Sequence, residues 1–280
     1  MNRIGIVGAG TMGTDIAHLA AESGINVLLY DSDESQLKNS YEKIQNRLKK
    51  YLKKDRIKQN DIGEISSRIK MYNDINNIAN ANFIIECIPE DLDLKKEIFT
   101  KLDKICRPGT ILATNTSSIS ITEIASATTR PESVVGIHFL IPARIMEIVE
   151  LIPGLSTSRE TIEITKDMLK QMKKITIEAP DFPGFMLNRL VLPLVNEAAF
   201  LVYEKRAKPE AIDKLMTMGT GIPMGPLALA DMIGLDIVLA VAEQMYHGYS
   251  DSKYRPCPLF KQYVAAGYLG KKSGRGFYRY

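Results

Sequence analysis

The sequence predicts an α/β fold with a doubly wound parallel sheet, followed by an all-α domain. Its first apolar segment, Arg3–Val7, leads directly into Gly8-Ala9-Gly10-Thr11-Met12-Gly13, a G-x-G-x-x-G pattern that opens a helix. Short apolar segments then alternate with amphipathic ones as far as Glu178, which is typical of βαβ units. After Pro183-Gly184 only helical patterns remain. We therefore expect a Rossmann-like domain over residues 1–183 and a helical domain over residues 184–280.

The spacing of apolar residues predicts the individual elements. Short runs rich in Ile, Val and Leu predict strands over 3–7, 26–30, 68–72, 83–88, 111–114, 134–139, 148–152 and 174–178. Helical spacing predicts helices over 13–23, 93–104, 119–127 and 159–172, and an inserted helical hairpin over about 34–70. The second domain is predicted to contain helices over 185–205 (interrupted by Pro193), 210–218, 227–246 and 259–266. Because this helical domain is strongly apolar, we expect it to form a homodimer.

The glycine pattern predicts a dinucleotide site. Gly8 permits the tight turn after the strand, Gly10 lets a pyrophosphate approach the backbone, and Gly13 lets the helix pack closely on the strand. The second strand ends in Asp31, whose carboxylate can accept both hydrogen bonds of a ribose diol and would repel a 2′-phosphate. The preferred cofactor is therefore NAD rather than NADP. The alternative is an ordinary glycine-rich turn of an α/β protein. The expected cofactor loop consists of Gly8, Gly10, Thr11, Met12 and Gly13.

Composition excludes several classes of function. A net charge of +3 gives no reason to expect a nucleic-acid partner, and no apolar run is long enough to span a bilayer. The three cysteines, Cys87, Cys106 and Cys257, are scattered and odd in number, which is typical of reduced thiols in a cytoplasmic protein. Only three histidines occur, without metal-ligand spacing, so no metal site is expected.

The inserted hairpin is unusually basic. Between Lys43 and Lys58 it has eight basic residues and one acidic residue, and Arg47, Lys50 and Lys54 share a helical face with Lys43. One interpretation is a solvated helix face. The other is a basic arm that contacts an anionic ligand, such as a nucleotide phosphate.

His138 is the candidate general base. It ends the predicted strand 134–139, at the edge of the sheet where α/β proteins place their chemistry. Glu150 lies in the otherwise apolar strand 148–152, and it can hold one imidazole nitrogen if that strand returns beside the first. The alternatives are a hydrogen-bonded core histidine and a carboxylate at a strand edge.

Two further groups of polar residues follow strands. Asn115-Thr116-Ser117-Ser118 can supply hydrogen-bond donors near a nicotinamide, or Ser118 can cap the next helix. Glu86, Glu90 and Lys95 can reach ribose hydroxyls, or they are loop charges.

Several motifs together resemble one family over essentially the whole chain. They are Asn115-Thr116-Ser117-Ser118, Gly136-Ile137-His138-Phe139, Val149-Glu150, Pro183-Gly184-Phe185-Met186-Leu187-Asn188-Arg189, Pro223-Met224-Gly225-Pro226 and Gly270-Lys271-Lys272-Ser273-Gly274-Arg275-Gly276-Phe277-Tyr278. In order and spacing they are similar to the short-chain L-3-hydroxyacyl-CoA dehydrogenases, and among these to the bacterial enzymes for 3-hydroxybutyryl-CoA. The resemblance implies NAD-dependent interconversion of 3-hydroxybutyryl-CoA and acetoacetyl-CoA, and a helical dimerisation domain.

The resemblance also implies residue roles. His138 would remove the proton of the 3-hydroxyl group, Glu150 would orient His138, and Ser117 and Asn188 would hydrogen-bond the substrate oxygen. The implied NAD contacts, besides the glycine loop and Asp31, are Glu90, Lys95, Asn115, Ser117 and Lys272. The implied contacts to the CoA part are Lys54 and, in place of a serine, Arg47.

Besides Arg47, three residues depart from the family pattern, namely Ile141, Arg144 and Glu147. Ile141 replaces an asparagine, Glu147 replaces a lysine, and Arg144 replaces a small residue. The identity of the acyl group that the enzyme accepts therefore stays open. Arg144 and Glu147 would suit a polar acyl group, so both are candidate substrate contacts, as is Ser117. An alternative substrate is the same hydroxyacyl group on an acyl carrier protein, because both carriers present phosphopantetheine. A binding or structural protein without turnover is a third possibility, and retention of the catalytic set argues against it.

Overall fold

The computed structural model describes residues 3–280, and the chain forms two compact units that divide between Asp181 and Phe182. Each unit is described by itself. The strands of the first unit are β1 (Arg3–Val7), β2 (Asn26–Tyr30), β3 (Ile69–Tyr72), β4 (Phe83–Glu86), β5 (Ile111–Thr114), β6 (Val134–Phe139), β7 (Ile148–Pro153) and β8 (Ile175–Glu178). Its helices are α1 (Thr11–Glu22), α2 (Glu34–Leu52), α3 (Gln59–Ser67), α4 (Leu92–Ile105), α5 (Ile121–Ala125) and α6 (Arg159–Gln171), with 3₁₀ turns η1 (Ile75–Ile78) and η2 (Pro131–Ser133).

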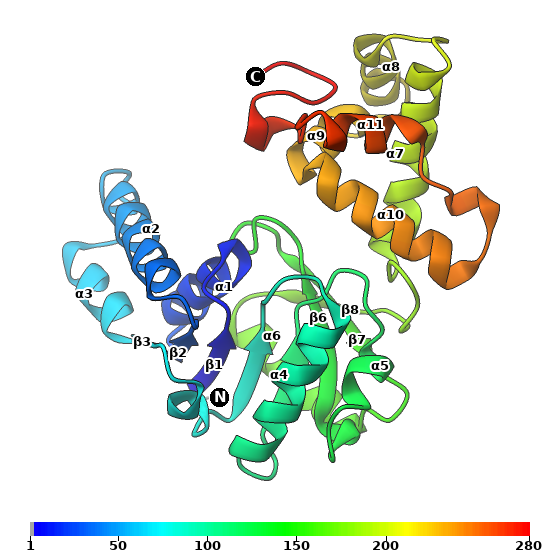
Figure 1. The fold of residues 1–280 in the computed structure, drawn as a ribbon. Helices are drawn as coiled ribbons and strands as arrows, with labels where there is room; N and C mark the ends of the chain where they lie inside the picture. The colour runs from blue at the N-terminus through cyan, green and yellow to red at the C-terminus, as the bar shows by residue number, and fades with distance from the viewer. Residues whose placement is uncertain (1–2) are drawn as a thin grey trace. The chain divides into compact units, whose positions relative to one another are not determined.

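The strands form one eight-stranded sheet in the order β3-β2-β1-β4-β5-β6-β7-β8 (Figure 1). All neighbouring pairs are parallel except β6 and β7, which are antiparallel. The predicted doubly wound α/β fold is therefore confirmed. The strand order reverses between β1 and β4, which is the point in the topology where sheets of this kind bind ligands.

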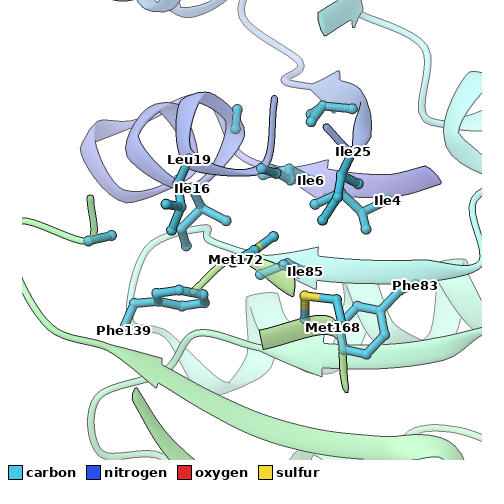
Figure 2. Close-up of a cluster of buried hydrophobic side chains, with 14 of the residues drawn as sticks. Ile4, Ile6, Ile16, Leu19, Ile25, Phe83, Ile85, Phe139, Met168 and Met172 are labelled. Carbon is cyan, nitrogen blue, oxygen red and sulfur yellow. The ribbon is translucent and has the colours of Figure 1, made fainter. Parts of the chain in front are cut away.

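Helices cover both faces of this sheet. Figure 2 shows Ile16 of α1 and Met168 of α6 in the same apolar cluster as Ile85 of β4, so α1 and α6 share one face. Gly136 lies between two residues of β6 that belong to this cluster, so a Cβ atom on it would point to the opposite face. There it would lie 2.5 Å from Ile121 of α5, which places α5 on the other face.

The second unit is helical. It contains α7 (Leu187–Tyr203), α8 (Pro209–Thr220), α9 (Pro226–Ile233), α10 (Leu235–Tyr249) and α11 (Pro258–Ala265), with 3₁₀ turns η3 (Ser252–Tyr254) and η4 (Lys271–Ser273). These helices enclose their own apolar core. The fully buried Asp231 accepts hydrogen bonds from the backbone N–H groups of Phe277 (3.0 Å) and Tyr278 (2.9 Å), which ties the C-terminal segment to α9. A Cβ atom on Gly276 would lie 2.0 Å from the same carboxylate, which is why a glycine stands there.

Two predicted elements differ from the structure. The helix predicted over 227–246 is two helices, because Gly234 adopts a φ of +108° between α9 and α10. The alternative that Ser118 caps the next helix is wrong, since α5 begins later and Ser120 caps it by accepting from the Glu123 N–H. Over residues 3–280 no helix is both long and apolar enough to cross a membrane.

Candidate active site

The glycine loop between β1 and α1 is shaped for a dinucleotide. Gly8 has a φ of +102°, and a Cβ atom there would lie 2.7 Å from the carbonyl oxygen of Cys87, in the loop that follows β4. A Cβ atom on Gly13 would lie 1.8 Å from the Gly8 carbonyl oxygen, so the close packing of α1 on this loop needs a glycine at position 13. Gly10 faces open space and begins α1 without a side-chain cap. The loop therefore leaves room, and helix N-terminal N–H groups, for a pyrophosphate.

Asp31 lies directly beside this loop. Its carboxylate accepts hydrogen bonds from the N–H groups of Ala9, at 2.7 Å, and Asp33, at 3.0 Å. A carboxylate has about four acceptor positions, so these two bonds leave capacity for ribose hydroxyls. The residues of the loop and Asp31 thus fit the dinucleotide that the sequence predicts.

The imidazole of His138 and the carboxylate of Glu150 are in contact. The two residues face each other across the antiparallel pair β6 and β7, and Nδ1 of His138 lies 2.8 Å from Oε2 of Glu150. Both are almost fully buried, with 8% and 3% of their surface exposed. The strand containing Glu150 does return beside that of His138, as the sequence analysis expected. His138 also lies near the carboxyl end of β6, the same edge of the sheet as the glycine loop.

Glu90 organises the loop that follows β5. Its Oε1 accepts from the hydroxyls of Thr116 (2.6 Å) and Ser118 (2.9 Å) and from the N–H of Ser117 (2.9 Å). Burial opposes ionisation of Glu90, but the charge of Lys95 and these hydrogen bonds outweigh it and lower the pKa of the carboxyl. The loop is thus held as one unit. Sequence reasoning singled out Glu90 and Ser117 individually, but it named Thr116 only within the group 115–118 and did not foresee its hydrogen bond to Glu90.

Asn115 connects that loop to β6, the strand that contains His138. Its side-chain oxygen accepts from the N–H of Phe139, at 3.0 Å, directly after His138. The loop after β5 and the end of β6 are therefore held together by a side chain that the sequence placed near the cofactor.

Lys95 is buried, with 1% of its surface exposed, and its ammonium lies 2.7 Å from Oε1 of Glu86. Glu86 also accepts from the hydroxyl of Thr114 (2.7 Å) and from the N–H of Ile88 (2.7 Å). Burial raises the pKa of Glu86, and the positive charge of Lys95 opposes that rise. In this structure Lys95 supports the loop after β4, and direct contact with NAD stays a prediction.

The residues expected to contact substrate lie in different environments. Arg47 of α2 forms an ion pair with Asp15 of α1, at 2.6 Å, and Arg144 approaches the same carboxylate at 3.7 Å. Lys54 and Glu147 are exposed. Contact of these four side chains with substrate stays a prediction, and the two guanidinium groups already have partners within the first unit.

The second unit supplies the remaining predicted residues. Asn188 lies in the first turn of α7. The ammonium of Lys272, in η4, lies 2.6 Å from the carboxylate of Asp236 at the start of α10. Their roles toward substrate and NAD stay predictions.

A dinucleotide-binding sheet with an imidazole–carboxylate pair at the same sheet edge defines a class of protein, the nicotinamide-dependent dehydrogenases. Residues 3–182 match the family model described as the NAD binding domain of 3-hydroxyacyl-CoA dehydrogenase, and residues 184–280 match that of its C-terminal domain. The chain belongs to the 3-hydroxyacyl-CoA dehydrogenase family. It is an NAD-dependent oxidoreductase of this family.

Individual relatives match this chain over nearly their whole length. A probable 3-hydroxybutyryl-CoA dehydrogenase of Bacillus subtilis is 46% identical over 280 residues, which is 100% of this chain and 98% of the relative. A 3-hydroxybutyryl-CoA dehydrogenase of Bradyrhizobium diazoefficiens is 42% identical over 100% of this chain and 96% of its own. The crystal structure of (S)-3-hydroxybutyryl-CoA dehydrogenase from Ralstonia eutropha superposes with a TM-score of 0.95 at 42% identity, covering 100% of this chain and 99% of that one.

Proposed function

We propose that this protein interconverts (S)-3-hydroxybutyryl-CoA and acetoacetyl-CoA, with His138 as the general base. The observation that carries the proposal is the 2.8 Å contact between His138 and Glu150 at the edge of the sheet where the glycine loop lies. The names of the full-length relatives at 42% and 46% identity support the substrate.

His138 and Glu150 divide the proton chemistry between them. Because the carboxylate of Glu150 contacts Nδ1, it keeps the hydrogen of the neutral ring on Nδ1 and makes Nε2 the basic nitrogen. In oxidation, Nε2 takes the proton of the 3-hydroxyl group while the hydrogen on C3 departs as hydride. NAD, when bound, supplies the acceptor for that hydride. Glu150 then stabilises the imidazolium that results, and reduction reverses each transfer.

Other residues would hold the reactants. We infer that Ser117 and Asn188 hydrogen-bond the substrate oxygen, whose negative charge changes during the reaction. The support for Ser117 is that its backbone N–H donates a hydrogen bond to Oε1 of Glu90, at 2.9 Å, which fixes the loop. For NAD, the proposed contacts are the glycine loop with Thr11 and Met12, then Asp31, Glu90, Lys95, Asn115, Ser117 and Lys272.

The basic end of α2 is the proposed contact for the carrier. Lys54 lies two residues after the end of α2 and is exposed, as are Lys49, Lys50 and Lys53. These ammonium groups suit the phosphates of CoA. They would equally suit the phosphopantetheine of an acyl carrier protein, so the assay must separate the two carriers.

A direct assay follows NADH through its near-ultraviolet absorbance with acetoacetyl-CoA and, separately, with an acetoacetyl-loaded acyl carrier protein. We expect rapid oxidation of NADH with the CoA ester, little oxidation of NADPH, and loss of turnover in His138→Gln. Turnover with the carrier protein alone would contradict the CoA proposal. Turnover with neither would contradict the proposed substrate altogether.

We further propose that the enzyme is a cytoplasmic homodimer that associates through its helical unit. Leu190, Leu194 and Leu201 of α7 are 75%, 39% and 37% exposed and lie on one stripe of the helix. Leu215 and Met218 add exposed apolar surface on α8, at 71% and 77%. Light scattering on a sizing column should give twice the chain mass, and Leu190→Glu should reduce it. A monomer at micromolar concentration would contradict the proposal.

A further inference from the structure

The loop between β6 and β7 contains an arginine that contacts two helices of the first unit. The side chain of Arg144 is only 12% exposed, and its Nε lies 3.7 Å from Oδ1 of Asp15 in α1. Its guanidinium also donates a hydrogen bond to the phenol oxygen of Tyr51 in α2, and lies 5.9 Å from the centre of that ring. This side chain therefore has its polar partners within the first unit.

The loop itself is anchored on both sides of Arg144. Ala143 is fully buried in the apolar core of the first unit. On the other side, the ammonium of Lys174 donates to the carbonyl oxygen of Met146, at 2.7 Å. Because the loop directly follows the strand that contains His138, Arg144 has a fixed position relative to the proposed catalytic base.

Tyr51 links Arg144 to the basic end of α2. Its carbonyl oxygen accepts from the N–H groups of both Lys54, at 3.1 Å, and Arg56, at 3.0 Å, so it closes the turn after the helix. Its ring stacks on the buried His18, with centroids 6.0 Å apart. One helical turn earlier, Arg47 holds α2 to Asp15 at 2.6 Å. The position of Tyr51 therefore determines where the backbone of Lys54 lies.

We propose that Arg144, instead of contacting the acyl group directly, is a positioning residue for the phosphate-bearing end of the substrate. It fixes Tyr51, and Tyr51 fixes the turn that presents Lys54, so that this ammonium stands at a set distance from His138. Arg144 acts through Lys54, because its own guanidinium is mostly buried on Asp15 and Tyr51. This inference rests on the proposed function, in which Lys54 contacts the phosphates of CoA.

The test compares two substrates in Arg144→Ala: acetoacetyl-CoA and the acetoacetyl thioester of N-acetylcysteamine, which lacks every phosphate. We expect KM for acetoacetyl-CoA to rise about tenfold, the scale of one charge-assisted hydrogen bond, with kcat nearly unchanged. The kcat/KM for the truncated thioester and the affinity for NADH should stay the same. Arg159→Ala is the matched control, because it removes the same charge from a side chain that is 71% exposed.

A double substitution shows whether Arg144 acts through Lys54. If it does, Arg144→Ala combined with Lys54→Ala should bind acetoacetyl-CoA no worse than Lys54→Ala alone. Tyr51→Phe, which removes only the acceptor oxygen, should raise the same KM, and it gives the same comparison if Arg144→Ala does not fold.

Three results would overturn the inference: additive losses in the double variant, equal losses on both thioesters, or an unchanged KM in Arg144→Ala and Tyr51→Phe. A wild-type protein that does not reduce acetoacetyl-CoA would instead refute the proposed function. That result is visible before any variant is compared.

Discussion

Replacing Glu150 by glutamine tests the proposed chemistry most directly. The substitution keeps the shape of the side chain and an oxygen able to accept from Nδ1 of His138, and it removes only the negative charge. The two side chains are 2.8 Å apart and are 11% and 5% exposed, so solvent screens the pair weakly. At an effective dielectric constant of about 20, unit charges centred about 4 Å apart attract by about 4 kcal/mol.

The transition state develops part of the imidazolium charge, so it loses between about half and all of this attraction in Glu150→Gln. A loss of about 2 to 4 kcal/mol corresponds to a decrease in kcat of about 30-fold to 1000-fold. Single-turnover oxidation of (S)-3-hydroxybutyryl-CoA at saturating NAD isolates the chemical step. Glu160→Gln is the control, because it removes an equal charge from an exposed site on α6.

A single-turnover rate within threefold of the wild-type rate would refute the reasoning, provided that the variant folds. Folding is checked by circular dichroism. The chain has no tryptophan, so NADH fluorescence can be titrated without interference from indole emission. Unchanged NADH affinity together with a slow chemical step would assign the loss to the imidazole–carboxylate pair.

Four other substitutions have defined outcomes. His138→Gln should lower kcat by several orders of magnitude while NADH still binds in a fluorescence titration; retained turnover would exclude an imidazole base. Asp31→Ala should weaken NADH binding by about 10- to 100-fold, because charge-assisted hydrogen bonds to ribose are lost, and unchanged affinity would contradict that role. Lys95→Met should lower the free energy of unfolding in urea by about 3–5 kcal/mol, because it leaves Glu86 buried without its ammonium; a loss under 1 kcal/mol would be inconsistent with this. The pKa of Glu90 is lowered below 4.5 on folding, so its ionised form stabilises the fold above pH 4.5 and this contribution disappears as the pH falls through the lower value. The stability difference between wild type and Glu90→Gln, measured in urea at several pH values, should therefore shrink in acid, and a constant difference would count against it.

Features that depend on local pattern could be predicted from the sequence. The order of strands and helices up to β8 follows from apolar spacing, and the glycine loop follows from a motif in which Gly8 and Gly13 meet steric limits of the fold. The His138–Glu150 contact could also be predicted, because a carboxylate in an apolar strand needs a partner and the neighbouring strand contains a histidine.

Features that depend on tertiary partners could not be predicted from the sequence. Lysine is seldom buried, so nothing local indicates that Lys95 lies inside the unit on Glu86. A single glycine is tolerated within helices, so the sequence did not show that Gly234 separates two of them. Its φ of +108° ends α9, and the pattern of apolar residues gives no sign of that backbone angle. The ion-pair partners of Arg47 and Arg144 could likewise not be predicted, because a sequence pattern shows where a charge is but not which carboxylate it contacts.

The antiparallel strand β7 makes the contact between His138 and Glu150 possible. A sheet that stayed parallel throughout would need a crossover connection between β6 and its neighbour, but here the chain turns back within the loop that contains Arg144 and pairs His138 directly with Glu150. Side chains alternate between the two faces of a strand, so a register shift of one residue would put Val149 or Leu151 opposite the imidazole and turn the carboxylate to the other face. The apolar neighbours of Glu150 are fully buried on the face covered by α1 and α6. Packing of that core therefore specifies the register, and the register places the carboxylate on Nδ1. A core substitution such as Leu151→Asp should thus impair catalysis as well as stability, although it touches no reacting atom.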